Sequence, residues 1–402
     1  MMVPKLRFAG FNEPWSETSL GKISSFITSG SRDWAQYYAD GGDKFIRMTN
    51  LVRDGITLNL SDLKFVRLPE NSNEGKRTAL QHHDILISIT AELGKLGWVP
   101  DDLGTAYINQ HTALVRPNLS IVSSKFIANL LSTKKYNNIL NQQNDSGAKS
   151  GLNLSTIKNF GFYATNKIEQ TKIADFLSSV DEKIALLTKQ YEQLCQYKKG
   201  IMQQIFSQKF RFKEGGGKDF PEWGEVTLEN IGSFFSGGTP ASTNRNYYNG
   251  VIPFIRSAEI NSDSTELFIS EEGLNSSSAK LVNKGDILYA LYGATSGEVG
   301  ISKIHGAINQ AILCIRSTLN TSFLYYFLKS SKEQIVSTYI QGGQGNLSAE
   351  IIRKLKVPTP STGEQIKIAN FLSALDDKIT AKKAELDKLK IWKQGLLQQM
   401  FV

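Results

Sequence analysis

Few side chains in this sequence stand in a pattern that would support catalysis. An Asp-Glu-Lys run at 181–183 resembles the D-x-K fragment of a nuclease, but an Asp-Asp-Lys run repeats it at 376–378, and both fall in segments with helical periodicity. A solvated, charged helix face explains both runs. His82 and His83 precede a predicted strand and lack a second pair of ligands at helical or hairpin spacing, which favours solvated turn residues over a metal site.

The motifs of nucleotide and methyl-group chemistry do not occur either. Gly217–Lys218 is followed by Asp219 and lacks the upstream glycine of a P-loop, and GATSGEVG (293–300) does not match the G-x-G-x-x-G of a dinucleotide site. The Asn/Asp-Pro-Pro-aromatic segment of an amino-methyltransferase is absent. Cys195 and Cys314 form neither a disulfide framework nor a metal-ligand spacing. We therefore expect no catalytic residue, no metal site and no cofactor bound by this chain.

The length and composition predict a soluble protein with more than one domain. The chain has 402 residues, more than one hydrophobic core usually serves. No apolar run approaches the roughly 20 residues of a membrane span, and the N-terminal segment MMVPKLRFAGFNEPW lacks the apolar region of a secretory signal, so we expect a cytoplasmic location. The formal net charge of +8 fits a nucleic-acid-binding protein, but a solvated basic surface explains it equally well.

A long internal repeat organises the sequence. EQTKIADFLSSVDEKI at 169–184 returns as EQIKIANFLSALDDKI at 364–379, and the match continues without a gap from 169–206 onto 364–401, with 17 identities in 38 positions and a constant offset of 195. A repeat of this length indicates a duplicated unit rather than a short-period solenoid. Ser361 with Glu364 has the spacing of a helix capping box.

Each copy of the repeat has two apolar columns at heptad spacing, which predicts a long helix in a coiled coil. Because the chain carries both copies, we expect the two helices to pair with each other as an antiparallel coiled coil and to act as a spacer of about 57 Å. Lys198 and Lys393 occupy equivalent positions in the columns, where they either set the helix register or extend their amines to solvent. The predicted seam residues are Ile173, Leu177, Val180, Ile184, Leu187, Tyr191, Leu194, Ile368, Leu372, Leu375, Ile379, Leu386 and Leu389.

The blocks between the helices repeat weakly but in the same order. KLRF or KFRF, a tryptophan, FIR, DIL, INQ and NLS recur in each half, and short buried strands alternate with helical segments such as 126–140 and 321–340. We therefore predict a mixed α/β (α+β) fold with a pseudo-two-fold internal repeat: two similar globular domains separated by two long helices. The predicted boundaries are 1–165 for the first domain, 166–208 for the first helix, 209–360 for the second domain and 361–402 for the second helix.

These motifs together resemble the specificity subunit of type I restriction–modification enzymes. The residues that carry the resemblance are PKLRF…W, SGGTP (236–240), GDILYALYGATSGEVG (285–300), the INQ triplets, QGNLS (344–348) and the EQ.KIA.FLS..D.KI opening of each helix, and the resemblance spans essentially the whole chain. One departure is SGSRD (29–33), which stands where the second half has SGGTP, so the DNA contacts of the first domain are harder to place.

The resemblance implies a non-catalytic DNA-recognition protein with partners. In this family, two target-recognition domains each read one half of a bipartite, gapped site on double-stranded DNA, and the conserved helices set the gap. Two modification subunits would use S-adenosylmethionine to methylate adenine. Two restriction subunits, where present, would use ATP and magnesium to move along and cut DNA.

Polar loops between the repeated motifs supply the candidate DNA contacts, because phosphates attract Lys, Arg, Ser and Thr, and base edges attract Arg, Lys, Asn and Gln. The loop SGGTPASTNRNYYNG combines hydroxyls, amides, an arginine and two tyrosines, although an ordinary surface loop would have the same composition. Arg47 and Arg256 recur in both FIR triplets, which favours a shared scaffold or phosphate role over base reading. The candidates are Arg32, Arg53, Lys76, Arg77, Lys95, Thr239, Arg245, Asn246, Tyr247, Tyr248, Tyr292 and Lys303.

Two alternatives remain open from the sequence. A non-catalytic scaffold protein could use the helices to bind partner helices and the globular domains to bind other proteins. A nuclease or methyltransferase that acts alone is the second alternative, and the missing motifs count against it.

Overall fold

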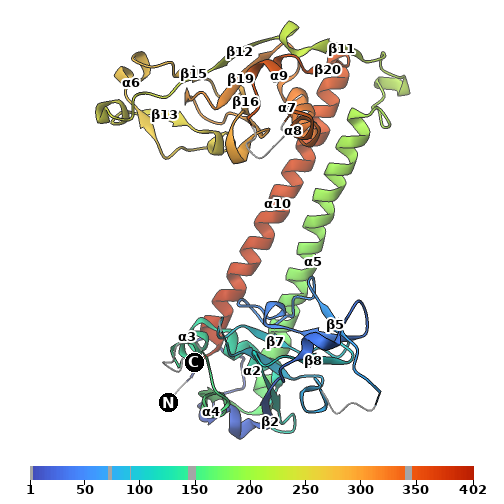
Figure 1. Cartoon of the computed structure of the whole chain (residues 1–402), viewed down its shortest axis with the longest axis vertical. Coiled ribbons are helices and arrows are strands. Elements are labelled where there is room, and N and C mark those ends of the chain that lie inside the picture. Colours follow the sequence, from blue (N-terminus) through green and yellow to red (C-terminus); the bar gives the residue numbers. More distant parts are fainter. Residues whose placement is uncertain (1–2, 71–74, 91, 144–150, 340–345) are drawn as a thin grey trace. The chain divides into compact units, whose positions relative to one another are not determined.

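The computed structural model describes residues 3–70, 75–90, 92–143, 151–339 and 346–402. The chain divides into two compact units: unit 1 comprises residues 1–188 and 385–402, and unit 2 comprises residues 189–384. Each unit therefore holds one globular domain and a part of each long helix (Figure 1). The first two residues of the QGNLS motif lie outside the described residues.

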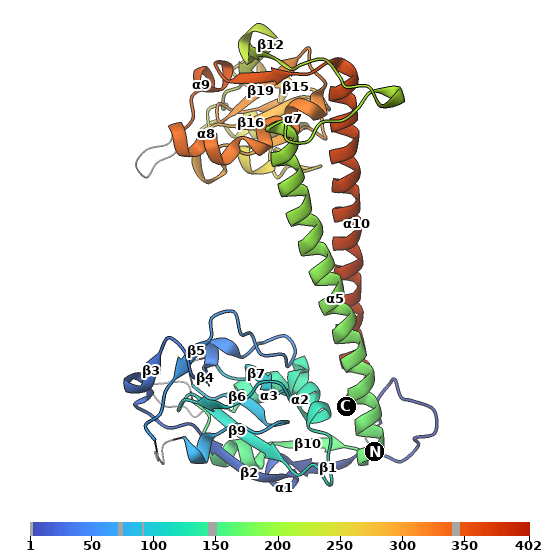
Figure 2. The same ribbon diagram turned by 90° about the vertical axis from the view of Figure 1, so that its right-hand side faces the viewer.

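Unit 1 is built on a four-stranded antiparallel central sheet whose strand order is β2-β9-β6-β7 (Figure 2). All four residues of β6 are buried, as the apolar run DILIS predicts for a central strand. A second sheet has the order β3-β5-β4-β8, with β4 and β8 parallel, and β1 pairs with β10. The strands are β1 (Ser16–Ser19), β2 (Ser24–Ser29), β3 (Tyr38–Ala39), β4 (Asp43–Ile46), β5 (Lys64–Val66), β6 (Ile85–Ser88), β7 (Leu96–Trp98), β8 (Ala106–Ile108), β9 (Thr112–Pro117) and β10 (Gly161–Ala164).

Unit 2 repeats this architecture with one change. Its central sheet has the equivalent order β12-β19-β16-β17, and β11 pairs with β20 as β1 does with β10. In the second sheet, β13 and β18 are parallel like β4 and β8, but the outer strands differ and the order is β14-β13-β18-β15. The strands are β11 (Gly224–Thr227), β12 (Gly232–Ser236), β13 (Ile252–Ile255), β14 (Phe268–Ile269), β15 (Lys280–Val282), β16 (Ile287–Ala290), β17 (Val299–Ile301), β18 (Gly306–Ile308), β19 (Ile312–Ser317) and β20 (Lys356–Thr359).

Short helices complete both domains. The segments predicted as single helices at 126–140 and 321–340 each form two helices, because Thr133 ends α2 and caps α3 with its hydroxyl, and the chain turns between α7 and α8. The helices are α1 (Leu20–Ile23), α2 (Ser124–Ser132), α3 (Lys134–Gln142) and α4 (Leu154–Asn159) in unit 1, and α6 (Glu271–Asn275), α7 (Thr321–Ser330), α8 (Lys332–Tyr339) and α9 (Ala349–Arg353) in unit 2.

Two long helices, α5 (Lys167–Phe206) and α10 (Thr362–Met400), run through both units. In unit 2 the ion pair between Lys198 and Asp376 and the stacking of Lys383 on Tyr191 show that residue numbers rise along one helix as they fall along the other, which is antiparallel packing. Among the predicted seam residues, those that are buried are Ile173, Leu177, Val180, Leu187, Ile368, Leu372, Leu375 and Leu386, and those that are half-buried are Ile184, Tyr191, Leu194, Ile379 and Leu389.

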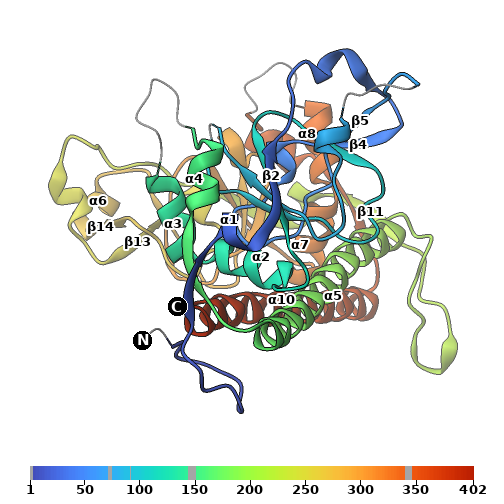
Figure 3. The same ribbon diagram turned by 90° about the horizontal axis from the view of Figure 1, so that it is seen from below.

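The segment before β1 and the end of the long helix α10 lie together in unit 1 (Figure 3). The amide of Leu6 donates a hydrogen bond of 2.9 Å to the carbonyl of Gln399, and the buried Phe401 packs on Trp15 and Phe126. The core of the first domain thus includes the last residues of the sequence. Across the described ranges, no helix is long and apolar enough to cross a membrane.

Candidate functional site

In both units, a glycine fixes the loop that leaves the central sheet. A Cβ atom at Gly237 would lie 1.7 Å from the carbonyl oxygen of Ile308, and one at Gly30 would lie 2.1 Å from that of Asn109, so neither position accepts a side chain without a shift of the backbone. These glycines belong to the SGGTP and SGSRD motifs, and the carbonyls belong to the INQ triplets. The repeated motifs therefore hold the start of each candidate DNA-binding loop against the end of a strand.

Most candidate DNA-binding residues lie around the same edge of the central sheet. At this edge, which we call the loop edge, β2 and β6 end and β9 begins in unit 1, and β12 and β16 end and β19 begins in unit 2. Thr239 donates a hydrogen bond of 2.7 Å to Gln310, two residues before β19, and Tyr292 follows the end of β16 with 38% of its surface exposed.

The loop 239–248 of unit 2 is held by hydrogen bonds within the loop and from Ser270. The hydroxyl of Tyr248 donates to the carbonyl of Pro240 at 2.6 Å, and the carbonyl of Tyr247 accepts from the amide of Ser270 at 2.9 Å. Arg245 and Asn246 are exposed on a short 3-10 helix, Arg245–Tyr248. The loop therefore presents a guanidinium and an amide on a backbone that is already ordered.

In unit 1, Arg32 is exposed two residues after Gly30, and the guanidinium of Arg77 donates to the carbonyl of Ser29 at 3.0 Å. Lys76 is the exposed neighbour of Arg77 on a 3-10 helix, Lys76–Thr78. These basic residues come from segments far apart in sequence and meet at the loop edge.

Arg53 and Lys95 lie beside Glu92. Lys95 forms an ion pair with Glu92, and its backbone amide donates to the Ser88 hydroxyl at the end of β6. The hydrogen bond from Lys95 and its charge, with a smaller contribution from Arg53, lower the pKa of Glu92. Lys95 is thus partly neutralised, while Arg53 is exposed.

Lys303 is not at the loop edge. It is exposed next to Ser302, whose backbone pairs with Gly285 and Asp286 before the start of β16. The structure therefore places Lys303 at the opposite end of β16 from Tyr292.

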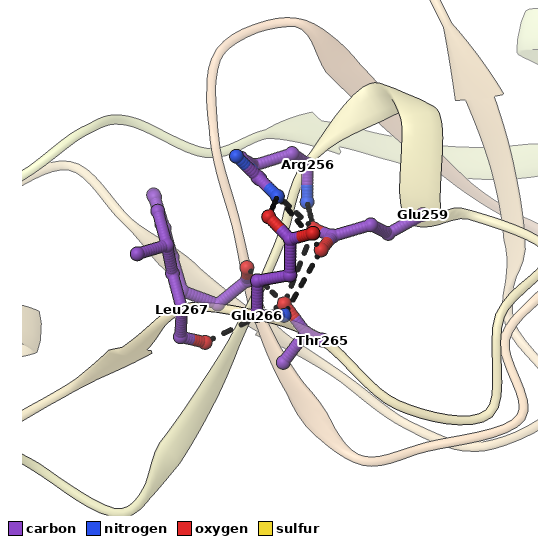
Figure 4. Close-up of polar contacts among 6 residues, drawn as sticks. Arg256, Glu259, Thr265, Glu266 and Leu267 are labelled. Carbon is purple, nitrogen blue, oxygen red and sulfur yellow. Dashed lines mark hydrogen bonds and ion pairs between the residues drawn. The ribbon is translucent and has the colours of Figure 1, made fainter. Parts of the chain in front are cut away.

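Arg256 is occupied by carboxylates, as Figure 4 shows. Its guanidinium donates to Glu259 at 3.0 and 3.1 Å and to Glu266 at 2.5 Å, while its backbone amide donates to Glu259 at 3.0 Å. Burial alone would raise the pKa of Glu259, but the hydrogen bonds from Arg256 and from backbone amides outweigh it and lower the pKa to about 2. In unit 1, Arg47 bonds to Asp62 at 2.8 Å, and Asn50 takes the place of Glu259. These contacts favour a scaffold role for both arginines.

The start of each long helix is held by a buried carboxylate. Glu169 and Glu364 have fully buried side chains, and their carboxylates accept hydrogen bonds from the guanidinium groups of Arg7 and Arg211, at 2.7 Å in unit 1 and at 2.9 and 3.3 Å in unit 2. The Ser361 hydroxyl accepts from the Glu364 amide at 3.4 Å, but the carboxylate does not return to the cap as in a capping box. The repeated KLRF and KFRF motifs were the sequence signal for these ion pairs, and their role was not predicted.

The acidic residues of the D-x-K-like runs require a correction. Asp181 and Asp376 are not simply part of a solvated face, because each forms an ion pair with a lysine of the other long helix, Lys393 and Lys198 respectively. Sequence periodicity missed this because an aspartate beside an apolar column looks the same whether or not a lysine from another segment faces it.

The histidines before β6 are turn residues, as expected. His83 is half-buried, bonds to Asp101 at 2.9 Å and packs its ring on Trp98, and His82 is exposed. No group of His, Cys, Asp and Glu in the described part of the chain could hold a metal ion.

The sequence profile of a family described as "Type I restriction modification DNA specificity domain" matches residues 12–196 and, a second time, residues 221–390. The chain belongs to this family. The resemblance inferred from the repeated motifs is thereby confirmed, and so is the mixed α/β fold with an internal repeat.

Individual relatives agree with this assignment. The putative type I restriction enzyme MjaX specificity subunit of Methanocaldococcus jannaschii is 27% identical over 297 residues, which cover 71% of this chain and 68% of the relative. The MjaVIII specificity subunit of the same organism is 25% identical over 383 residues, which cover 90% of this chain and 83% of that one. The crystal structure of the type I S subunit from M. genitalium superposes with a TM-score of 0.63 at 18% identity, covering 100% of this chain and 99% of that one.

Membership of the family gives the loop edges a context. Specificity subunits of type I systems recognise a DNA sequence, carry no catalytic activity of their own and assemble with modification subunits. The candidate contacts named above are the side chains that the fold presents around one edge of each domain, and their role in DNA binding stays a prediction, as do the predicted domain boundaries.

Proposed function

We propose that this chain recognises a bipartite, gapped site on double-stranded DNA, with each domain reading one half-site and the long helices setting the gap. The observation that carries the proposal is that the same edge of the same central sheet carries different side chains in the two units. Unit 1 presents mainly arginines and lysines there, and unit 2 presents hydroxyls, an amide, an arginine and tyrosines. Two like scaffolds with different polar loops suit two different half-sites.

Two modification subunits would dock on the long helices, because the helices carry exposed aromatic side chains at positions related by the repeat. Trp392 is 49% exposed and its equivalent Tyr197 is 53% exposed. Aromatic contacts also recur near the helices: Phe8 packs on Phe176 at 5.7 Å in unit 1, and Phe212 packs on Phe371 at 5.5 Å in unit 2. Exposed aromatic side chains are typical of protein interfaces.

The chemistry of the complex would reside on the partners. We propose that the modification subunits bind S-adenosylmethionine and methylate adenine, and that restriction subunits, where they join, use ATP and magnesium. This chain would bind none of these cofactors and would work with DNA in the cytoplasm.

The test is to co-express the chain with its modification subunit and map adenine methylation by single-molecule sequencing. We expect one gapped, bipartite motif that depends on this chain. Exchange of residues 1–165 for the corresponding domain of another family member should change one half-site and leave the other intact. A change in both half-sites would contradict the modular interpretation.

The competing scaffold interpretation makes a different prediction. DNA binding through phosphates releases counterions, so affinity should fall by orders of magnitude between low and moderate salt. A stable complex that gives no methylation and binds DNA weakly, without salt dependence, would favour a scaffold.

A further inference from the structure

Two ion pairs lie between the long helices, one in each unit. Lys198 Nζ is 2.5 Å from Asp376 Oδ1 in unit 2, and Lys393 Nζ is 2.5 Å from Asp181 Oδ1 in unit 1. The two lysines, like the two aspartates, stand 195 positions apart, which is the offset of the internal repeat. The duplication has therefore preserved both halves of the interaction.

These lysines occupy positions at which a coiled coil usually places apolar residues. The side chain of Lys198 is only 9% exposed and that of Lys393 only 13%. Burial lowers the pKa of Lys198, and the hydrogen bond to Asp376 opposes that effect without cancelling it. An ammonium group buried this far without a carboxylate partner is strongly destabilising.

The apolar seam does not by itself select one register, because it repeats every seven residues. If α10 slipped by one heptad in one direction, the residues directly opposite Lys198 and Lys393 would be Ala369 and Ala174. A slip in the other direction would bring Lys383 and Thr188. None of these residues carries a carboxylate, so either slip would break both ion pairs at once.

We propose that Lys198, Asp376, Lys393 and Asp181 determine the helix register and thereby the number of unread base pairs between the half-sites. The inference rests on the proposed function. One heptad of helix is about 10 Å long, which corresponds to about three base pairs of DNA. These four side chains are positioning residues that hold the gap to one length.

The test uses the full chain in complex with its modification subunit and measures the gap in the methylated motif by single-molecule sequencing. Asp376→Lys should lower methylation at sites with the native gap by about tenfold or more, because it faces Lys198 with a like charge. The double variant Lys198→Asp/Asp376→Lys should restore methylation at the same gap. Asp377→Lys is the matched control, since the neighbouring Asp377 is exposed, and should leave methylation unchanged.

A second pair of variants separates register from folding. Seven residues inserted into both helices, between the two ion pairs, should keep both pairs and lengthen the gap by about three base pairs. The same insertion into α10 alone allows only one pair to form and should abolish the single gap length.

The outcomes are distinguishable. If the wild-type complex methylates no gapped motif, the proposed function fails. If the wild type gives a gapped motif but Asp376→Lys methylates it as well as Asp377→Lys does, or the double swap folds without restoring it, the register inference is wrong.

Discussion

Unit 1 and unit 2 have equivalent central sheets and equivalent contacts at the starts of the long helices. They differ around the lysine–aspartate ion pair between the long helices. In unit 2, Tyr326 of α7 donates a hydrogen bond of 2.7 Å to Asp376, and its ring lies 5.0 Å from Lys198 Nζ. The equivalent residue in unit 1 is Asn129, which bonds to the carbonyl of Lys125 on its own helix.

The equivalence is set by the helix starts. Ser123 and Asn320 cap α2 and α7, and their amides donate to Gln170 and Gln365 at 3.0 and 2.8 Å. Six residues after each cap stand Asn129 and Tyr326.

In unit 1 the ion pair borders a cavity instead. Asp181 and Lys393 line a cavity of about 380 Å³, together with Ser132, Thr133 and Lys134 among other residues. The comparison teaches that the duplicated helices kept their mutual contacts, whereas the contact from the ion pair to the globular domain was free to change.

The largest expected effect comes from removing the arginine–glutamate ion pair that each unit has at the start of a long helix. Arg211→Met removes the guanidinium from the buried carboxylate of Glu364 and should destabilise unit 2 by about 3–5 kcal/mol, because a buried charge loses its partner. Arg7→Met should do the same to unit 1. Chemical denaturation of the full chain measures both. The double variant Arg211→Met/Glu364→Met should lose less than the sum of the single changes, and strict additivity would contradict the ion-pair interpretation.

A smaller loss of stability is expected from a change in unit 2 but not from the matched change in unit 1. Burial and the bond to Asp376 raise the pKa of the Tyr326 hydroxyl, which therefore stays a donor. Tyr326→Phe should cost about 1.5–3 kcal/mol, the usual value of a hydrogen bond to a charged group. Asn129→Leu is the matched change in unit 1 and should cost nothing or stabilise, because within the described residues no group bonds to the buried Asn129 Oδ1. If both variants lost the same amount of stability in the same denaturation assay, the proposed difference between the units would be wrong.

A stabilising change is expected in unit 2. Tyr289 on β16 stands where β6 has Ile87, and its hydroxyl is buried without a hydrogen-bond partner among the residues that the structure describes. Burial raises the pKa of this hydroxyl. Tyr289→Phe should therefore stabilise unit 2 by about 1 kcal/mol, read as a higher Tm in differential scanning calorimetry. A lower Tm would mean that the hydroxyl has a partner.

A further expected effect appears only in acid. The pKa of Glu259 is about 2, below the ordinary value of 4.5. A carboxylate with a lowered pKa contributes stability that is fully present above the unfolded-state pKa and is lost as the pH falls toward about 2. Glu259→Gln should reduce this acid dependence in urea denaturation between about pH 4.5 and 2. Asn50, its counterpart in unit 1, does not titrate, so Asn50→Ala should leave the pH dependence unchanged.

The sequence predicted the two long helices and the order of the repeated motifs well, because a heptad pattern and an ungapped repeat are visible in the spacing of residue types. It predicted less of what joins distant segments. Arg7 with Glu169, and Lys393 with Asp181, are separated by 162 and 212 positions, and no local pattern shows that they meet. The solvated-face interpretation of Asp181 was wrong for this reason.

The candidate DNA-binding residues also divide into positions that the sequence explained and positions that only the structure explained. Gly30 and Gly237 stand in recognisable motifs, and the structure explains both by their contact with the INQ strands. Lys303 was chosen because it is polar and lies between motifs, yet the strand order places it at the far end of β16 from Tyr292. Composition identifies a polar loop, but only the sheet topology shows to which edge the loop belongs.

The core of unit 1 is completed by residues 385–402, and this has a consequence for biosynthesis. The ribosome must translate residues 189–384, the whole of unit 2, before it makes the segment that carries Phe401. Domains made first usually fold first. Here the N-terminal domain must wait with an uncovered apolar surface around Trp15 and Phe126 until residues 385–402 leave the exit tunnel. We expect chaperones and proteases to act on this uncovered form of the first domain.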